Sequence, residues 1–123
     1  MNPPLYTIHN IIYTPMRRGF LYCLSNPSMP NLFKIGYTSR TVECRLVELN
    51  RATGVPTPFH CEMRRELTDV VTGERIAHQV LKPYRENPRR EFFRLGDLEH
   101  VRICFDTIRL HMEHGESRII PML

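Results

Sequence analysis

The sequence lacks several features that mark whole classes of protein. No stretch of its 123 residues approaches the roughly 20 consecutive apolar residues that span a bilayer. The N-terminus also lacks a charged segment followed by an apolar one, the pattern of a secretory signal. The cysteines show no paired spacing, which argues against a zinc knuckle and a disulfide framework. We therefore expect a cytoplasmic protein with no membrane partner and with reduced, mostly buried thiols at Cys23, Cys44, Cys61 and Cys104.

Lysine is also scarce. Lys34 and Lys82 are the only lysines among the 17 basic residues, and the rest are arginine. Arginine grips phosphate through two parallel hydrogen bonds, so this composition and the net charge of +4 favour a polyanionic partner. A soluble surface with excess positive charge would give the same balance.

Internal repeats and low-complexity segments are absent, and 123 residues suit a single domain that buries about two-thirds of its unfolded surface. Pro3, Pro4 and Pro15 mark residues 1–16 as an N-terminal arm. We predict the domain itself over residues 17–115 and a C-terminal tail over residues 116–123.

Hydrophobic periodicity predicts the elements of this domain. Strands are expected over residues 19–24, 32–37, 58–64 and 91–95. Helices are expected after the N-cap candidates Thr41, Thr68 or Asp69, and Asp97, and should end near residues 52, 81 and 111–115. This order predicts a small α/β domain of the α+β type, with a mainly antiparallel central sheet flanked by helices.

Tyr22 and Lys34 lie in the first two predicted strands. If this hairpin folds about Ser28, Tyr22 lies opposite Lys34 and both side chains project from one face. A phenol beside an ammonium group is a plausible proton-transfer pair, because a neighbouring cation lowers the pKa of a phenol. Taken alone, the pattern is more typical of an ordinary hairpin with an exposed lysine.

The first two predicted helices each carry a charged residue on the apolar side. Arg45 follows Val42 by three residues and precedes Leu49 by four, which places it at the edge of the buried stripe. Such an arginine either pairs with a carboxylate, Glu48 or Glu74, or reaches a bound phosphate.

Glu74 lies on the inward stripe of the second helix, and His78 follows it by one turn. A half-buried glutamate is uncommon unless it is paired or bound to a metal. The structural alternatives are an ion pair between Glu74 and Arg45, and a hydrogen bond from His78 to Glu74 or to the backbone.

These residues together carry a family resemblance. The tripeptides FLY at 20–22 and KIG at 34–36, followed by Arg45 and Glu74, resemble the GIY-YIG nuclease superfamily over about residues 17 to 95. Residues 25–30, 34–38, 53–56 and 91–93, and the pair Glu74 and His78, are similar to the small stand-alone branch typified by a phage T5 open reading frame.

The resemblance implies a metal-dependent DNA endonuclease of a phage or mobile element that hydrolyses phosphodiester bonds with one divalent ion, Mg²⁺ or Mn²⁺. By position, Tyr22 would orient or activate the attacking water, with Lys34 sharing in proton transfer. Arg45 would bind the scissile phosphate. Glu74 would hold the metal, with His78 supporting it.

The chain departs from the family pattern at two places. Lys34 stands where the second tripeptide usually has tyrosine, as in this branch and in some restriction enzymes of the superfamily. Many members also place an asparagine after the metal-binding helix. Here Asn87 lies beside Pro88 in a predicted loop, and neither Asn87 nor Glu91 is assigned that role.

DNA is the expected partner. A protein of this charge should contact phosphates through clustered arginines, for which the candidates are Arg40, Arg64, Arg65, Arg89 and Arg90. The apolar residues of the last helix suit either the core or the seam of a homodimer formed through this C-terminal helix; they are Val101, Phe105, Ile108 and Met112.

Two other functions fit the same sequence. The scaffold could bind DNA without cutting it, in which case affinity should fall steeply with salt. Alternatively, the polar residues could form a structural ion-pair network in a protein-interaction subunit, which would not bind DNA.

Overall fold

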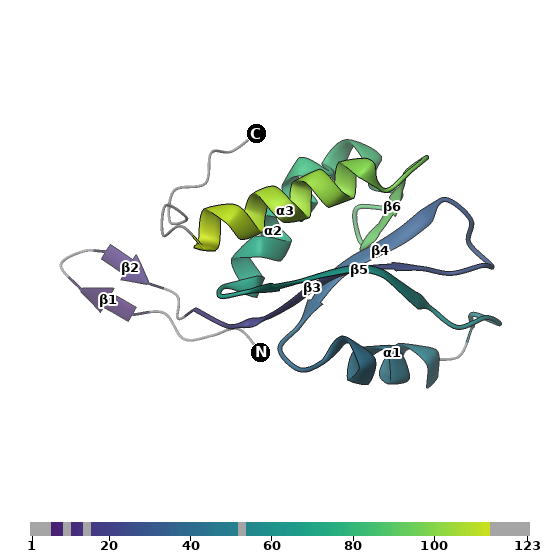
Figure 1. Ribbon diagram of the computed structural model, residues 1–123, viewed down its shortest axis with the longest axis horizontal. Coiled ribbons are helices and arrows are strands. Elements are labelled where there is room, and N and C mark those ends of the chain that lie inside the picture. Colours follow the sequence, from purple (N-terminus) through teal and green to yellow (C-terminus); the bar gives the residue numbers. More distant parts are fainter. Residues whose placement is uncertain (1–5, 9–10, 14–15, 52–53, 114–123) are drawn as a thin grey trace.

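The computed structural model describes residues 6–8, 11–13, 16–51 and 54–113 (Figure 1). The main sheet has the strand order β5-β3-β4-β6, and every neighbouring pair is antiparallel. Its strands are β3 (Gly19–Ser25), β4 (Leu32–Thr38), β5 (His60–Leu67) and β6 (Phe92–Arg94). The helices are α1 (Val42–Arg51), α2 (Val70–Val80) and α3 (Glu99–Glu113), with a short 3-10 helix η1 (Lys82–Tyr84) after α2.

The predicted fold class is confirmed. From β3 onward the elements follow the predicted order of strand, strand, helix, strand, helix, strand, helix. In the arm, β1 (Tyr6–Ile8) and β2 (Ile11–Tyr13) pair with each other as a separate two-stranded sheet. The predicted end of the last helix near Gly115 lies outside the described residues.

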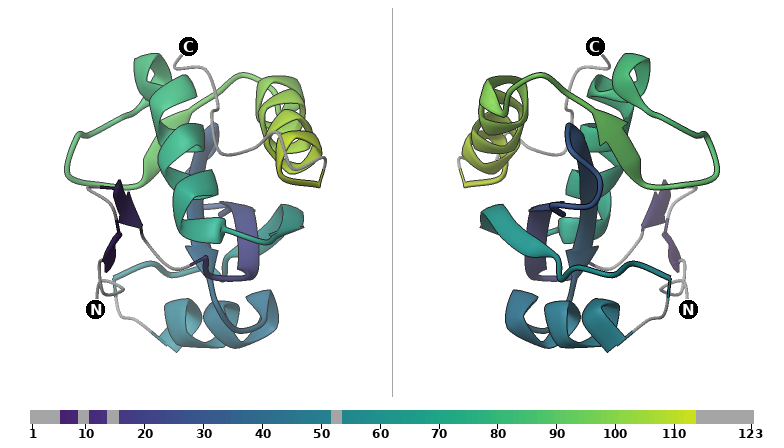
Figure 2. Two further views of the ribbon diagram at one scale, coloured as in Figure 1. Left: turned by 90° about the vertical axis from the view of Figure 1, so that its left-hand side faces the viewer. Right: turned by 90° about the vertical axis from the view of Figure 1, so that its right-hand side faces the viewer.

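The sheet is covered on both faces. Figures 1 and 2 show α1 against one face and α2 with α3 against the other. The central strand β3 is consequently buried on both sides, with all four residues Leu21–Leu24 at most 1% exposed. This burial explains why β3 is a continuous apolar run instead of an alternating one.

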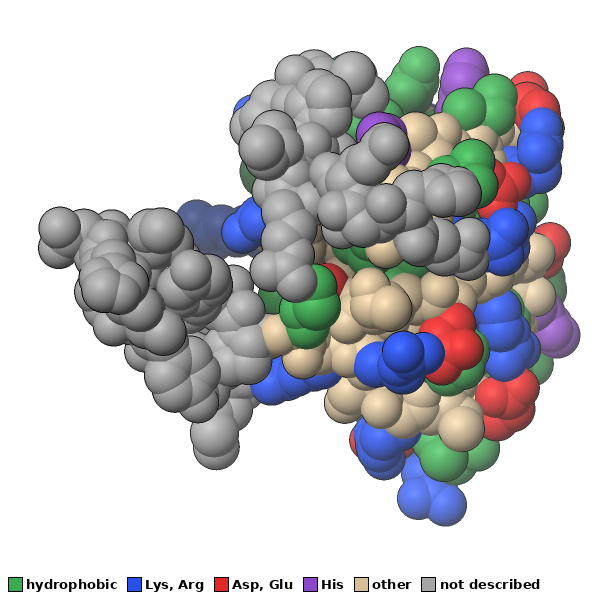
Figure 3. Space-filling model, turned by 60° about the vertical axis from the view of Figure 1, so that its left-hand side comes forward, with side chains coloured by type: hydrophobic (Ala, Val, Ile, Leu, Met, Phe, Trp, Pro, Cys, Tyr) green, Lys and Arg blue, Asp and Glu red, His purple; other side chains and the backbone are tan. Residues whose placement is uncertain are grey.

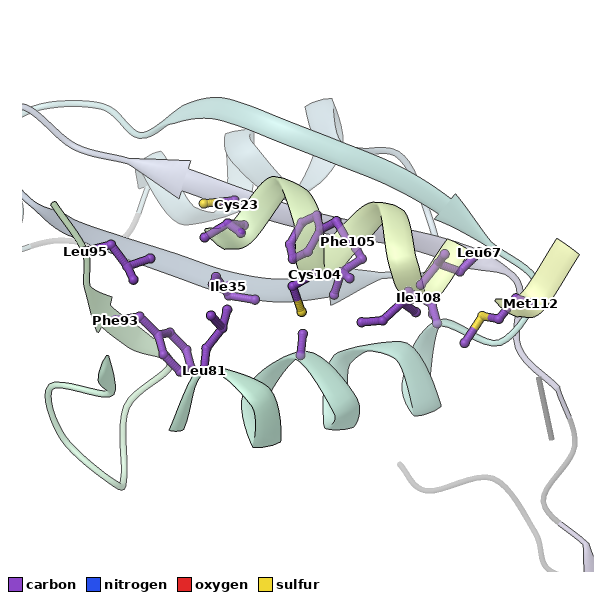
Figure 4. Packing of buried hydrophobic residues seen from close by; sticks show 14 residues of the cluster. Cys23, Ile35, Leu67, Leu81, Phe93, Leu95, Cys104, Phe105, Ile108 and Met112 are labelled. Carbon is purple, nitrogen blue, oxygen red and sulfur yellow. The ribbon is translucent and has the colours of Figure 1, made fainter. Parts of the chain in front are cut away.

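The main core lies between the sheet and the two helices α2 and α3 (Figure 4). A smaller cluster on the other face joins Tyr22 and Leu24 to Val42 of α1 and to Phe59. The side chains of Val101, Phe105, Ile108 and Met112 all belong to the main core. Of the two predicted alternatives for these four residues, the core is confirmed, because they are covered within the chain. A homodimer through the C-terminal helix stays a prediction.

Local capping explains where the helices begin. The Thr41 hydroxyl accepts a hydrogen bond from the Cys44 N–H at 3.1 Å, as expected of an N-cap. Asp69 caps α2 by accepting from the Thr72 N–H and hydroxyl. Asp97 accepts from the Glu99 N–H at 2.9 Å.

The strand after α1 differs from its predicted bounds. It begins at His60 rather than Pro58 and continues to Leu67, because it pairs along the whole of β3 as far as Gly19. A proline has no N–H to donate to a strand partner, which agrees with the later start.

Candidate functional site

The hairpin of β3 and β4 sets the position of Tyr22 and Lys34. Tyr22 lies opposite Gly36, and Lys34 lies opposite Leu24, so the predicted direct pairing of Tyr22 with Lys34 is wrong by two residues. A shift of two residues leaves each side chain on its original face of the sheet, because strand side chains alternate with a period of two. Tyr22 and Lys34 therefore do share one face, as diagonal neighbours.

The turn between these strands explains the shift. Asn26 O accepts from the Met29 N–H, Met29 O accepts from the Leu32 N–H, and Asn31 has a φ of 66°. The reversal is therefore centred on Met29 and not on Ser28. An asparagine tolerates this left-handed conformation better than most residues.

Tyr22 and Arg45 form the first part of the site. The Arg45 Nε donates to the Tyr22 hydroxyl at 3.4 Å, and Arg45 Nη1 lies 3.9 Å from Glu48. Gly36 makes room for this hydroxyl, because a Cβ at residue 36 would lie only 2.7 Å from the Tyr22 oxygen.

The pKa of Tyr22 is raised, mainly because the ring is buried, and the Arg45 guanidinium offsets only part of this effect. A neighbouring cation does lower the pKa of Tyr22, as expected, but this cation is Arg45 and not Lys34, and burial outweighs its effect. The phenol is neutral at physiological pH, accepts a hydrogen bond from Arg45 and keeps its own proton for donation.

The second part of the site lies at the edge of β4. Strand β6 pairs with Leu32–Lys34, and no other strand of the described residues covers the rest of this edge. Side chains of α2 take that place. His78 Nε2 donates to Ile35 O at 2.7 Å, and the Tyr37 N–H hydrogen-bonds to the Glu74 carboxylate. The hydrogen bond of His78 thus goes to the backbone, one of its two predicted alternatives, and not to Glu74.

Glu91, just before β6, joins this edge. One ligand atom from each of Glu74, His78 and Glu91 lies within 4.8 Å of the others, and all three side chains are half-buried. Lys34 Nζ is 3.4 Å from the Glu91 carboxylate. Two carboxylates and an imidazole are suitable ligands for a divalent metal ion, so the residues present fit the metal that the resemblance implies.

The predicted structural alternative for Glu74, an ion pair with Arg45, is not what the structure contains. The cations that act on its carboxyl are Lys34 and Arg85, whereas Arg45 approaches Glu48. Burial and the neighbouring Glu91 outweigh these cations and raise the pKa of Glu74 to about 7. Burial also lowers the pKa of His78.

A polar cleft of about 530 Å³ opens beside Glu74 and His78. Its other charged residues are all cations, namely Arg75, Lys82 and Arg85. The sequence analysis did not propose Arg75 or Lys82 as site residues. Exposed basic residues are common on helices and loops, so neither position carried a distinct signal in the sequence.

The arginines predicted to contact DNA occupy different surroundings. Arg40 pairs with Glu48, Arg64 with Glu43 at 2.6 Å, and Arg65 with Asp106 at 2.6 Å. On the face of the molecule shown in Figure 3, basic side chains likewise lie next to acidic ones. Arg89 and Arg90 are exposed in the loop that ends at Glu91, so they are nearest in sequence to the Glu74, His78 and Glu91 cluster.

An apolar groove of about 360 Å³ lies between α2 and α3. Its lining includes Ile76, Val80, Ile103 and His111 but no carboxylate, lysine or arginine among the described residues. It therefore lacks the groups that bind phosphate or a hard cation. Within the described part of the chain, no helix is both long and apolar enough to cross a membrane.

The four cysteines are free. Cys23 and Cys104 are buried, as predicted, whereas Cys61 is half-buried and Cys44 is exposed on α1. The prediction of buried thiols is therefore wrong for Cys44.

Fold and site together define a small α+β domain that gathers a tyrosine, an arginine, a lysine, two glutamates and a histidine around one hairpin. Comparison with family models agrees with this description. Residues 19–109 match the T5orf172 domain, and the chain belongs to this family. This match confirms the resemblance to the phage T5 branch. No curated protein and no solved structure matched the chain.

Proposed function

We propose that the protein is a metal-dependent DNA endonuclease that hydrolyses phosphodiester bonds by the one-metal GIY-YIG mechanism. The observation that carries this proposal is the convergence of polar groups at β4. Tyr22 and Arg45 lie over Gly36, and the Glu74, His78 and Glu91 cluster lies at the open edge of the same strand.

Each side chain has a role that its environment supports. Arg45 has only a weak carboxylate contact, at 3.9 Å, so its guanidinium can bind a phosphate and stabilise the charge that develops on it. The neutral Tyr22 hydroxyl, held by Arg45, orients the attacking water. Lys34 takes part in proton transfer beside Glu91.

Glu74 would hold the divalent ion, Mg²⁺ or Mn²⁺, and His78, whose ring is bonded to Ile35 O, would support Glu74 from one turn further along α2. When bound, the metal would supply positive charge that stabilises the pentacoordinate phosphate and the leaving oxygen. The hydrogen bond from the Tyr37 N–H favours the ionised form of the Glu74 carboxylate, which is the form that binds a metal.

A DNA-binding module without nuclease activity is the second candidate. The polar cleft favours it, because Arg75, Lys82 and Arg85 would attract phosphates whether or not the chain cuts DNA. Arg40, Arg64, Arg65, Arg89 and Arg90 are proposed as further phosphate contacts in either case.

Nicking of supercoiled and branched DNA tests the first candidate against the second. Wild type, Glu74→Gln and Arg45→Lys are compared in Mg²⁺ and in Mn²⁺, with a DNA-binding titration alongside. Glu74→Gln weakens the metal ligand, and Arg45→Lys keeps the charge but loses the planar fork that binds two phosphate oxygens. Each change should lower the nicking rate by about 10²- to 10³-fold, while DNA binding persists.

Glu86→Gln is the matched control, since Glu86 is exposed, its carboxylate pairs with Arg94, and it is not one of the three clustered ligand residues. Salt-sensitive binding by wild type without cleavage in either metal would favour the binding module. Absence of both would favour a protein-interaction role.

A further inference from the structure

We propose that Glu74, His78 and Glu91 together form a three-ligand site that binds a divalent transition metal, Mn²⁺ included, more tightly than Mg²⁺. The family resemblance assigns the metal to Glu74 alone. The inference shares its site with the proposed function, but it concerns metal binding in the absence of DNA and can be tested without cleavage.

The spacing of the ligand atoms suits a single ion. Two ligands about 2.1 Å from one ion are about 3 Å apart when adjacent and just over 4 Å apart when opposite. One ring nitrogen of His78 and one carboxylate oxygen from each of Glu74 and Glu91 all lie within 4.8 Å of one another. Small rotations of half-buried side chains would close this distance.

The hydrogen bond of His78 sets the state of its ring. A carbonyl oxygen can only accept, so the 2.7 Å contact with Ile35 O requires the proton to be on Nε2. Nδ1 is then left with a free lone pair. Metal-binding histidines commonly donate their other ring N–H to a backbone carbonyl in this way, which fixes the tautomer and the ring orientation.

The two carboxylates also have polar partners in the absence of a metal. Glu74 accepts from the Tyr37 N–H, and Glu91 lies next to the strand residue Phe92 and beside Lys34. With both carboxylates ionised and Lys34 protonated, these three groups carry a net charge of −1. A divalent ion would change this to +1, which complements the single negative charge of a phosphodiester.

The nitrogen ligand decides the metal preference. Mg²⁺ favours oxygen ligands, demands nearly ideal octahedral geometry and keeps several of its waters. Imidazole nitrogen binds transition metals more readily, so a site that offers His78 to the ion favours these over Mg²⁺. A site made of Glu74 alone would not discriminate in this way.

Binding of Mn²⁺ to the wild-type chain is the first test. The loss of the free Mn²⁺ signal in electron paramagnetic resonance gives the affinity, and competition with Mg²⁺ gives the preference. Pulsed measurements on the bound ion report directly on ligation, because an imidazole ligand produces a ¹⁴N modulation. We expect one Mn²⁺ per chain, displaced only by a large excess of Mg²⁺, with ¹⁴N modulation present.

Two variants then separate the ligands. His78→Gln can still donate to Ile35 O but replaces the nitrogen ligand with an amide oxygen, so it should weaken Mn²⁺ binding by roughly 10- to 100-fold and remove the ¹⁴N modulation. Its affinity for Mg²⁺ should change much less. Glu91→Gln should weaken the binding of both ions, and Glu86→Gln should change neither.

Several results would overturn the proposal. Equal affinity for the two ions, absence of ¹⁴N modulation in wild type, or unchanged Mn²⁺ binding in a folded Glu91→Gln variant would each exclude the three-ligand site. The wild-type spectrum decides the matter even if a variant fails to fold. Mn²⁺ binding without DNA cleavage would support the site while counting against the endonuclease, so the two proposals can fail separately.

Discussion

Removing the charge of Glu74 should stabilise the metal-free protein at alkaline pH. The pKa of its carboxyl is raised from 4.5 to about 7 in the folded protein, chiefly by burial. The folded state therefore holds this proton more tightly than the unfolded state does. The resulting stability is fully present below the unfolded pKa and is lost as the pH rises to the folded pKa, after which the loss is constant.

The size of the effect follows from the shift in pKa. A rise from 4.5 to about 7 corresponds to about 3 kcal/mol at about 1.36 kcal/mol per pKa unit. Glu74 is partly open to solvent, which reduces the expected loss to about 2 kcal/mol. Glu74→Gln keeps an oxygen for the Tyr37 N–H but cannot ionise, so it avoids this loss.

Urea unfolding in EDTA, followed by circular dichroism, measures the difference. At about pH 8 the Gln variant should be more stable than wild type by about 2 kcal/mol, and near pH 4.5 the gain should fall below about 0.5 kcal/mol. Glu43→Gln should behave oppositely, because Arg64 lowers the pKa of Glu43. A Glu74→Gln variant whose gain does not grow with pH would refute the reasoning.

Three further predictions concern the surroundings of the site. Gly36→Ala should lower the free energy of unfolding, measured in urea, by about 1–3 kcal/mol, because its Cβ would lie 2.7 Å from the Tyr22 hydroxyl. In Gly96→Ala the Cβ meets no atom within 4 Å, so this control should be nearly neutral. Equal losses in the two variants would contradict this account. Arg89→Ala should lower the salt dependence of DNA affinity by about one phosphate contact. Arg65→Ala should lower it less, because Asp106 already neutralises Arg65. Fluorescence anisotropy at several salt concentrations measures both, and a larger effect of Arg65→Ala would contradict this prediction. In the native protein, the exposed Cys44 should react rapidly with a thiol reagent. Cys23 should be protected, because it is buried and its pKa is raised to about 12. Mass spectrometry of labelled peptides measures both rates, and equal labelling would contradict this prediction.

Much of the fold could be predicted from local sequence signals. Thr41 and Asp69 cap helices through their own side chains, and the capping pattern is visible within four residues. The register of the hairpin could not be predicted, because the left-handed conformation of Asn31 moves the turn by one residue. The prediction that Tyr22 and Lys34 share one face of the sheet was nevertheless correct, since a shift of two residues preserves the alternation of side chains.

The candidate site was predictable only where a charged residue interrupts an apolar stripe. Arg45 and Glu74 stand out in this way on their helices. Glu91 carries no such signal, since it lies in a short segment before β6 and reaches Glu74 and His78 only through the pairing of β6 with β4. The raised pKa of Tyr22 was equally hidden, because it depends on how completely the helix α1 covers the ring.

The open edge of β4 has an evolutionary consequence. His78 and Glu74 satisfy the backbone groups of Ile35 and Tyr37 that a further strand would otherwise have bonded. A relative that had given up catalysis would still be selected to keep hydrogen-bonding side chains at these two positions, because a bare strand edge invites pairing with other chains. Conservation of these two residues among relatives would therefore reflect selection for solubility, and conservation of Arg45 would be the better indicator of retained catalysis.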